Sequence, residues 1–129
     1  MKLQAIAILT FLIFENVMAQ ETTTTKYINS TDMEALKLTQ EWDKTFPQSD
    51  KVEHTKITFH NRYGITLAAD LYKPKNTQGR LAAIAVSGPY GAVKEQVSGR
   101  YAQTLAERGF LTIAFDPSYY GESGGTPRY

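Results

Sequence analysis

The first hydrophobic feature of the chain is a nearly unbroken apolar run from Leu3 to Phe14, which follows Lys2 and ends at Glu15. A membrane-spanning helix needs about 20 apolar residues, so the run is too short for an anchor. A buried core helix is the other alternative. However, a positive residue at the start and a small residue, Ala19, after the run are typical of a secretory signal peptide. We therefore predict a cleaved signal peptide over residues 1–19 and an exported protein, periplasmic or extracellular.

The segment after the expected cleavage point is polar. Residues 20–30 are rich in threonine and should form a flexible lead. Thr31 and Glu34 then have the spacing of a capping box, which marks the start of a helix. The apolar residues that follow predict a short helix that ends before Pro47. The domain is accordingly expected to extend over residues 31–129.

Two strands joined by a turn are predicted next. Val52 to Phe59 alternates in part between polar and apolar residues, and Ile65 to Tyr72 forms a second strand-like run. The sequence Asn-Arg-Tyr-Gly at 61–64 lies between them and is typical of a turn, with a glycine suited to a positive φ. A short glycine-containing link between two strands indicates an antiparallel β-hairpin.

The pattern then changes to two apolar strands separated by a helix. Residues 81–86 and 110–115 are almost wholly apolar, as in parallel strands that are covered on both faces. From Lys94 to Arg108 the apolar positions fall at helical spacing. The expected buried face of this helix consists of Val97, Tyr101 and Leu105, with Ala102 and Ala106 beside them. Since a helix of this kind joins parallel strands, the fold class is α/β: an antiparallel hairpin leading into a parallel βαβ unit.

Two loops leave the carboxyl ends of these strands, which is where open parallel sheets bind ligands. The first, Ser87 to Ala92, contains two glycines and a proline. Its backbone N–H groups can therefore approach an anionic oxygen, although a tight strand-to-helix connection without a ligand explains the same residues equally well. The pattern of a phosphate loop is absent, because no serine or threonine follows Lys94.

The second loop contains a literal Gly-x-Ser-x-Gly motif at residues 121–125. A nucleophile elbow places its serine on a sharp turn between a strand and a helix. Here the strand ends near Asp116, and no helical pattern follows Ser123. We therefore interpret Ser123 as part of a glycine-rich surface loop, with its hydroxyl bonded to nearby backbone. Asp116 is either a catalytic acid at a strand end or a turn-forming residue before Pro117.

The remaining chemistry-bearing residues indicate no further site. His54 and His60 are the two histidines, and both lie on or beside the first hairpin strand, where packing or surface exposure explains them. There is no His/Cys cluster at zinc spacing, and we expect neither a metal nor a cofactor. The absence of cysteine excludes disulfides and a lipid-anchoring cysteine, and it is compatible with a bacterial periplasm.

Composition excludes two further classes of protein. The chain is 42% hydrophobic and 21% charged, which argues against intrinsic disorder. Its formal net charge is +1, so there is no electrostatic case for a nucleic-acid partner.

The loop sequences resemble those of bacterial α/β-hydrolases of the dienelactone-hydrolase-like group. The similarity is carried by VSGPYGAVKEQ, by YAQTLAERGFLTIAFDPSYYGESGG and by the earlier EWDKTFPQSDKVEHTKITFHNRYGITLAADLYKP. It covers Glu41 to Tyr129 and corresponds to the N-terminal portion of such a domain. The resemblance implies the N-terminal half of an α/β-hydrolase fold, with an incomplete sheet. It also implies a serine hydrolase that acts on esters or related acyl bonds.

The resemblance also assigns roles to residues. The loop with Gly88, Pro89, Tyr90 and Gly91 would be the oxyanion loop, with the backbone N–H of Tyr90 as one oxyanion donor. Relatives often carry His-Pro-Gly or His-Gly there, so Gly88 stands in place of a histidine and Tyr90 in place of a small residue. Ser123 would be structural.

In this family the nucleophile, the acid and the histidine come later in the chain, in that order. We therefore expect none of the triad in these 129 residues, and a fragment of an exported enzyme that is inactive alone. Its expected partners are a small ester-like substrate in the full-length form and a missing C-terminal half, with no membrane contact after signal cleavage. The alternatives are a small exported non-catalytic binding protein that uses the half-fold, and complementation by a separately encoded second half.

Overall fold

The computed structural model describes residues 35–128. The expected signal peptide, residues 1–19, and the expected flexible lead, residues 20–30, lie outside the described residues. Within the part that is described, no helix has the length and apolar character needed to cross a membrane.

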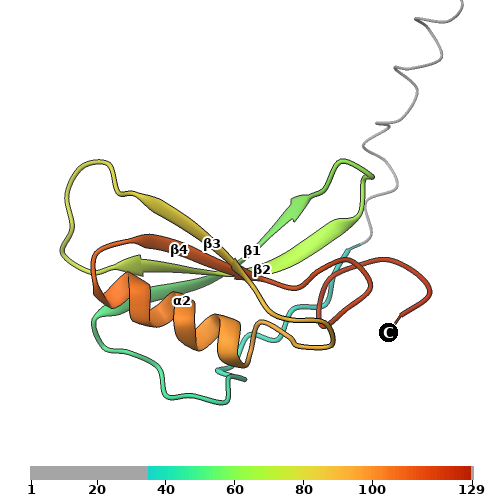
Figure 1. Ribbon diagram of the computed structural model, residues 1–129, viewed down its shortest axis with the longest axis horizontal. Coiled ribbons are helices and arrows are strands. Elements are labelled where there is room, and N and C mark those ends of the chain that lie inside the picture. The colour runs from blue at the N-terminus through green and yellow to red at the C-terminus, as the bar shows by residue number, and fades with distance from the viewer. Residues whose placement is uncertain (1–34, 129) are drawn as a thin grey trace, which may run out of the picture. The chain divides into compact units, whose positions relative to one another are not determined.

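The described residues form a four-stranded mixed sheet with one helix packed on it (Figure 1). The strand order is β1-β2-β4-β3. The elements are β1 (Val52–His60), β2 (Thr66–Pro74), β3 (Ala83–Ser87), α2 (Val97–Glu107) and β4 (Leu111–Phe115). The directions are antiparallel for β1 with β2 and for β2 with β4, and parallel for β3 with β4. This arrangement confirms the expected fold class, in which a hairpin leads into a parallel βαβ unit as in the N-terminal half of an α/β-hydrolase.

The hairpin forms where its turn sequence predicts it. β1 and β2 pair over their whole length, from Val52 opposite Pro74 to His60 opposite Thr66. The Asn61 side chain stabilises the turn, because its Oδ1 accepts the N–H groups of Tyr63 at 2.9 Å and Ile65 at 3.0 Å. Gly64 has a φ of 77°, which explains the need for glycine at that position.

The two apolar strands differ in burial because only one of them lies inside the sheet. β4 lies between β2 and β3, and its Thr112 and Ala114 are fully buried. β3 is an edge strand, and Ala83 and Ala85 are exposed. The expectation that this strand is covered on both faces is therefore wrong. Among the described elements α2 covers one face of β3, and the residues that alternate with the exposed alanines are half-buried.

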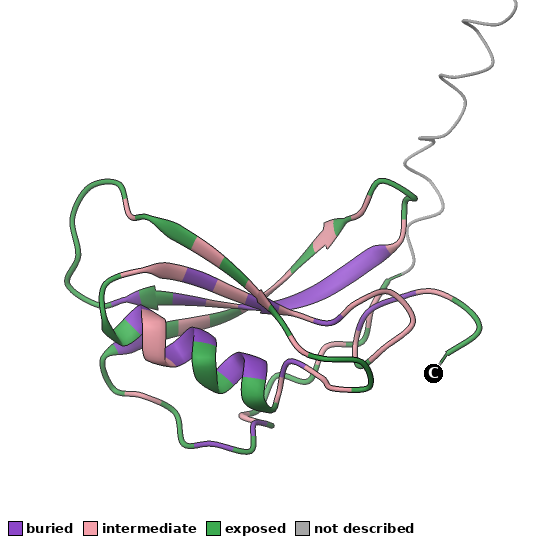
Figure 2. Ribbon diagram, viewed as in Figure 1, coloured by how far each residue is buried: buried purple, intermediate pink, exposed green. Residues whose placement is uncertain are grey.

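Helix α2 packs through small residues. Ala102 and Ala106 are fully buried and belong to one hydrophobic cluster with Tyr72 of β2 and Ala114 of β4 (Figure 2). Thr112 also donates its hydroxyl to the carbonyl of Ala102 at 2.8 Å, which ties the helix to β4. Because alanine side chains let the helix backbone approach the sheet closely, the helix needs no large apolar residue at its centre.

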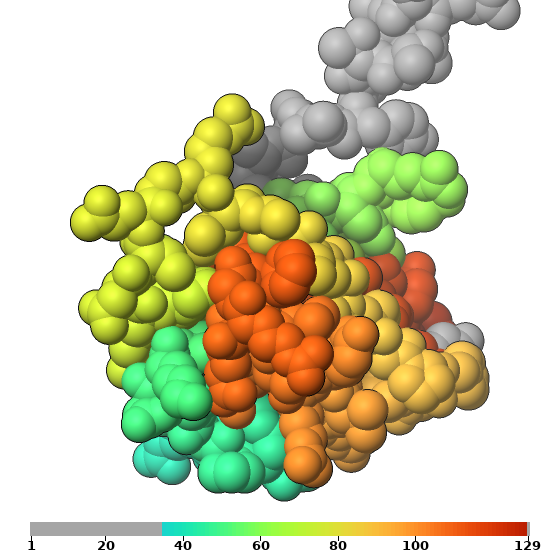
Figure 3. Space-filling model, turned by 60° about the vertical axis from the view of Figure 1, so that its left-hand side comes forward, coloured from blue at the N-terminus to red at the C-terminus, as the bar shows by residue number. Residues whose placement is uncertain are grey.

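The expected buried face of this helix is confirmed for Ala102 and Ala106 and wrong for Val97 and Tyr101. Val97 is 74% exposed and Tyr101 is 58% exposed, and both belong to the outer surface of α2, which is turned forward in Figure 3. Leu105 is half-buried. The helix is also shorter than predicted, since it begins at Val97. The row of Ala102 and Ala106 is buried against Tyr72.

The expected helix before Pro47 is also wrong for the residues that are described, since residues 35–47 contain no helix. Tertiary contacts hold this segment instead. The Thr45 N–H donates to the Glu95 carbonyl at 3.0 Å, and the Trp42 indole donates to the Phe46 carbonyl at 2.7 Å. Phe46 is buried, so the segment contributes a side chain to the interior without being helical.

We predict that substitutions on α2 follow the observed face. Val97→Lys should change the free energy of unfolding by no more than about 0.5 kcal/mol, since it alters an exposed position. Ala102→Leu should lower it by about 1–3 kcal/mol, because the site has no room for extra methylenes. Urea unfolding of both variants checks this. If Val97→Lys lowered the free energy of unfolding more than Ala102→Leu, Val97 would lie on the buried face, as periodicity predicts.

Candidate functional site

Two loops meet at the carboxyl ends of the parallel strands. Residues 88–96 leave β3 and residues 116–125 leave β4, and both lie at the same end of the sheet (Figure 1). Their side chains are in contact, because the rings of Tyr90 and Tyr120 have centroids 5.7 Å apart and planes inclined at 75°. This edge of an open sheet is where ligands bind in proteins of this class.

The first loop is a tight turn that exposes its centre. Ala92 donates its N–H to the Pro89 carbonyl at 3.0 Å, and Gly91 has a φ of 80°, as at the third position of a type II turn. A Cβ on Gly88 would lie only 3.0 Å from the Cβ of Ala92, so glycine is favoured there as well. Within the described chain, the N–H of Tyr90 has no hydrogen-bond acceptor. The loop therefore presents this donor to its surroundings.

Asp116 joins the two loops. Its carboxylate is fully buried and accepts the backbone N–H of Lys94 at 2.8 Å, the Lys94 ammonium at 2.9 Å and the Glu122 N–H at 2.9 Å. A Cβ on Gly121 would overlap this carboxylate, so only glycine fits there. Of the two interpretations of Asp116, the structure supports the turn-forming residue, because its carboxylate oxygens are already occupied.

The Lys94 ammonium is buried among three carboxylates. It contacts Glu122 at 2.8 Å and Asp116 at 2.9 Å, and it also pairs with Glu95. Burial alone would lower the pKa of Lys94, but its hydrogen bonds to Glu122 and Glu95 and the charge of Asp116 raise the pKa above its usual value. The ammonium therefore stays charged and serves to connect the loops.

The pairing continues as a network of charged groups, of which Asp43 is exposed and the others are buried or half-buried. Every member is within 3.0 Å of an oppositely charged neighbour, or of a carboxylate in the case of the histidine. From one end to the other, the chain of contacts is His54–Asp70–Lys44–Asp43–Lys56–Glu122–Lys94–Asp116. We call this set the ion network. It links residues before β1, both hairpin strands and the two loops. No sequence motif marks it, because its members are scattered over more than 70 positions.

Three carboxylates of this region lie close enough together to resemble a metal site. Asp43, Glu95 and Glu122 each offer an oxygen within 4.8 Å of the others. The ammonium of Lys56 already lies among them, at 2.9 Å from Asp43, 2.7 Å from Glu122 and 4.0 Å from Glu95. An internal cation therefore already occupies the space between these carboxylates, and we assign the cluster to the ion network.

Both histidines have structural partners. His54 Nε2 lies 2.7 Å from Asp70, and its ring packs edge-on against Trp42 with centroids 5.2 Å apart. His60 Nδ1 lies 3.2 Å from the Thr66 hydroxyl. Among the described residues, no serine hydroxyl bonds to a histidine, so these contacts agree with packing rather than catalysis.

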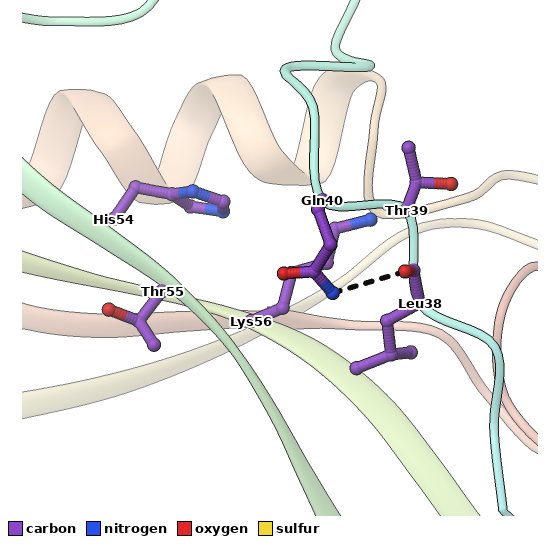
Figure 4. Close-up of a pocket in the computed structure, with 6 residues that line it drawn as sticks. All are labelled: Leu38, Thr39, Gln40, His54, Thr55 and Lys56. Atoms are coloured by element: carbon purple, nitrogen blue, oxygen red, sulfur yellow. Dashed lines mark hydrogen bonds between the residues drawn. The ribbon is translucent and has the colours of Figure 1, made fainter.

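A shallow pocket of about 240 Å³ lies beside His54, between β1 and the segment before it (Figure 4). Gln40 donates its side-chain amide to the Leu38 carbonyl at 3.1 Å across the wall of this pocket. The lining residues are Leu38, Thr39, Gln40, His54, Thr55 and Lys56. Because His54 and Lys56 are both paired with carboxylates of the ion network, the pocket has no uncommitted cation or base in its lining.

Ser123 is structural, as its context predicts, but it is fully buried rather than on the surface. Its hydroxyl donates to the Asp116 carbonyl and accepts the Ala68 N–H, both at 2.8 Å. Arg128 then donates to the Ser123 carbonyl at 2.7 Å. The hydroxyl ties the second loop to β2, so it is not available as a nucleophile.

No family model matches the chain. It is 71% identical over 107 residues to PA2218, an uncharacterised protein of Pseudomonas aeruginosa, and the match covers 82% of this chain and 29% of PA2218. The crystal structure of the PA2218 protein aligns with a TM-score of 0.72 and 76% identity, over 73% of this chain and 30% of that structure. The alignable region is therefore under a third of the relative.

Two further relatives are less similar. YcjY, an uncharacterised protein of Escherichia coli, is 51% identical over 79 residues, which are 58% of this chain and 26% of YcjY. The structure of DcsB in complex with its substrate analogue aligns with a TM-score of 0.53 and 26% identity, over 59% of this chain and 25% of DcsB. In each case the chain corresponds to about a quarter of the longer protein.

The ion network should make stability depend on acidic pH. Burial would raise the pKa of Glu122, but hydrogen bonds from Lys56, Lys94 and the Thr39 N–H lower it from 4.5 to about 2. In the same way, the pKa of Asp43 falls from 3.8 to about 2, because hydrogen bonds from its lysine neighbours outweigh burial. A lowered carboxyl pKa stabilises the fold above the unfolded-state pKa. We therefore predict that the free energy of unfolding falls as the pH drops from about 5 to about 2.

The variant Glu122→Gln tests this assignment. It should be less stable at neutral pH, because Lys56 and Lys94 each lose a carboxylate, and its proton uptake on unfolding should be smaller by up to about one. Denaturant unfolding at a series of pH values measures both effects. Glu53→Gln is the matched control, since Glu53 is exposed and lies 3.7 Å from Lys73 at the surface. Equal pH profiles for the two variants would contradict the prediction.

Ser123→Ala should lower the free energy of unfolding by about 1–3 kcal/mol, because the Ala68 N–H is left buried without an acceptor. Ser87→Ala, at an exposed position at the end of β3, should change it by no more than about 0.5 kcal/mol. Thermal unfolding compares the two. Esterase activity that disappears in Ser123→Ala without loss of stability would show that this serine is a nucleophile after all.

Proposed function

We propose that this chain forms the N-terminal, oxyanion-binding part of an exported serine hydrolase that cleaves esters or related acyl bonds. The observation that carries the proposal is the unpaired N–H of Tyr90, presented by a tight turn at the carboxyl end of β3. The dienelactone-hydrolase-like group is the proposed relationship. The nucleophile, acid and histidine are proposed to lie in sequence that corresponds to the remainder of the longer relatives.

The turn has the properties that an oxyanion donor needs. Acyl transfer generates a negative charge on the carbonyl oxygen, and a fixed N–H group that points at this oxygen stabilises it without reorganisation. Gly91 and the hydrogen bond from Ala92 to Pro89 define the turn, and the Lys94–Asp116 contacts fix the residues that follow it. The donor is thus part of a rigid connection and needs no closing movement.

The rest of the described site supports a hydrolase whose chemistry is completed elsewhere. Ser123 is occupied in two backbone hydrogen bonds, and the His54–Asp70 pair belongs to the ion network. These residues have a structural role and support the two loops. We therefore propose that this chain supplies the oxyanion donor and that the later sequence supplies the attacking serine.

A fusion tests the proposal. This chain, joined to the part of PA2218 that lies beyond the aligned region, should hydrolyse p-nitrophenyl acetate. Tyr90→Pro in the fusion removes the N–H together with the ring, and it should leave the turn intact because proline is favoured at the second position of such a turn. Tyr90→Ala keeps the N–H and is the matched comparison. We expect kcat of Tyr90→Pro to be about 10²–10³-fold below that of Tyr90→Ala, as for loss of one oxyanion donor.

Two results would contradict the proposal. One is a folded fusion, verified by circular dichroism and a cooperative melt, that cleaves no ester. The other is a Tyr90→Pro fusion as active as Tyr90→Ala, which would place the donor at another residue.

A further inference from the structure

The turn that presents the proposed oxyanion donor is exposed at its centre. The Tyr90 side chain is 91% exposed, and the hydrogen bond from the Ala92 N–H to the Pro89 carbonyl closes the turn around it. The contacts of Lys94 with Asp116 anchor the chain four positions after Tyr90. An N–H group stabilises an oxyanion only when it is held where the charge develops. A further contact at the centre of the turn would therefore help to hold the donor in place.

Tyr120, in the loop after β4, makes such a contact. Its ring lies against the ring of Tyr90, with centroids 5.7 Å apart and an interplanar angle of 75°. This edge-on arrangement is one of the favourable geometries of an aromatic pair. Because the contact is made to the residue that carries the N–H, it restrains the centre of the turn and not only its base.

The backbone that carries Tyr120 is itself attached to the sheet. The Tyr120 N–H donates to the Pro117 carbonyl at 3.3 Å, and the Tyr120 carbonyl accepts the Ser123 N–H at 3.0 Å. Ser123 is fully buried, and its hydroxyl connects the Asp116 carbonyl with the Ala68 N–H of β2. Tyr120 can therefore serve as a fixed support for the more exposed turn.

The residue before Tyr120 has a backbone conformation that bulky residues rarely adopt. Tyr119 has a φ of 75°, in the left-handed region. Its N–H donates to the Gly124 carbonyl at 2.9 Å, and its ring lies so close to Gly125 that a Cβ there would be 2.5 Å from a ring carbon. Strained backbone persists where the surrounding contacts over-determine it, and it concentrates at functional sites. The strain at Tyr119 therefore indicates that the direction of this part of the loop matters.

We propose that Tyr120 is a positioning residue for the oxyanion donor, because its ring holds Tyr90 and Tyr90 presents the N–H. The role needs no contact between Tyr120 and the substrate, since Tyr120 acts through Tyr90. This inference rests on the proposed function, and it adds the residue that supports the donor.

Kinetics of the fusion with the remainder of PA2218 test the inference. Tyr120→Ala should lower kcat for p-nitrophenyl acetate by about two- to tenfold, as for loss of one aromatic contact, with little change in KM. Tyr120→Phe keeps the ring and should recover most of the lost kcat. In the Tyr90→Ala fusion, which has already lost the contact, Tyr120→Ala should cause no further loss. Tyr101→Ala removes an exposed tyrosine from α2 and is the matched control.

A measurement on the chain itself separates this inference from the proposed function. In the ¹⁵N-labelled full chain, the NMR order parameter of the Tyr90 N–H should be about 0.85, as in rigid backbone, and should fall toward about 0.6 in Tyr120→Ala. It should stay high in Tyr120→Phe and in Tyr101→Ala.

Three results would decide against one proposal or the other. An unchanged Tyr90 order parameter in Tyr120→Ala would overturn the inference. An active fusion in which Tyr120→Ala leaves kcat unchanged, or lowers it equally with and without the Tyr90 ring, would refute the role of Tyr120 and leave the hydrolase intact. A folded fusion that cleaves no ester, although the order parameter falls as expected, would refute the proposed function and leave Tyr120 only as a support of the turn.

Discussion

The contact between Lys94 and Asp116 is the interaction on which the rest of the site depends. Both side chains are wholly buried, and removing one partner would leave an uncompensated charge in a low-dielectric interior. Asp116 engages Lys94 through the backbone and through the ammonium, so one carboxylate positions both the loop after β3 and the loop after β4. Gly121 is required because any side chain would displace this carboxylate.

The charges that surround this contact follow from the same constraint. A buried ammonium must be paired with an opposite charge. Lys94 pairs with Glu122, and Glu122 also pairs with Lys56. Asp43 then pairs with Lys56, which fixes the segment before β1 against the sheet. Residues 35–47 contain no helix, and tertiary contacts of this kind hold the segment in place.

Two groups at the base of the loops that could react are occupied in structural contacts. Ser123 and Asp116 are occupied in structural hydrogen bonds, which removes them as reactive groups. Among the described residues of this edge, the N–H of Tyr90 remains without an acceptor. The proposed oxyanion donor is a coherent arrangement for an acyl substrate, and it depends on a loop that the buried charges hold in place.

The sequence by itself determined the order and type of the strands, the hairpin turn and the structural nature of Ser123. These follow from local properties: strand periodicity, the glycine at position 64 and the distance of the serine from the end of its strand. Only the tertiary structure decided which face of α2 is buried and which charges are paired. Periodicity placed Val97 and Tyr101 inside, but the helix packs on Tyr72 and Ala114 through Ala102 and Ala106. The ion network joins residues far apart in sequence, and burial, which no local pattern encodes, is what forces them to pair.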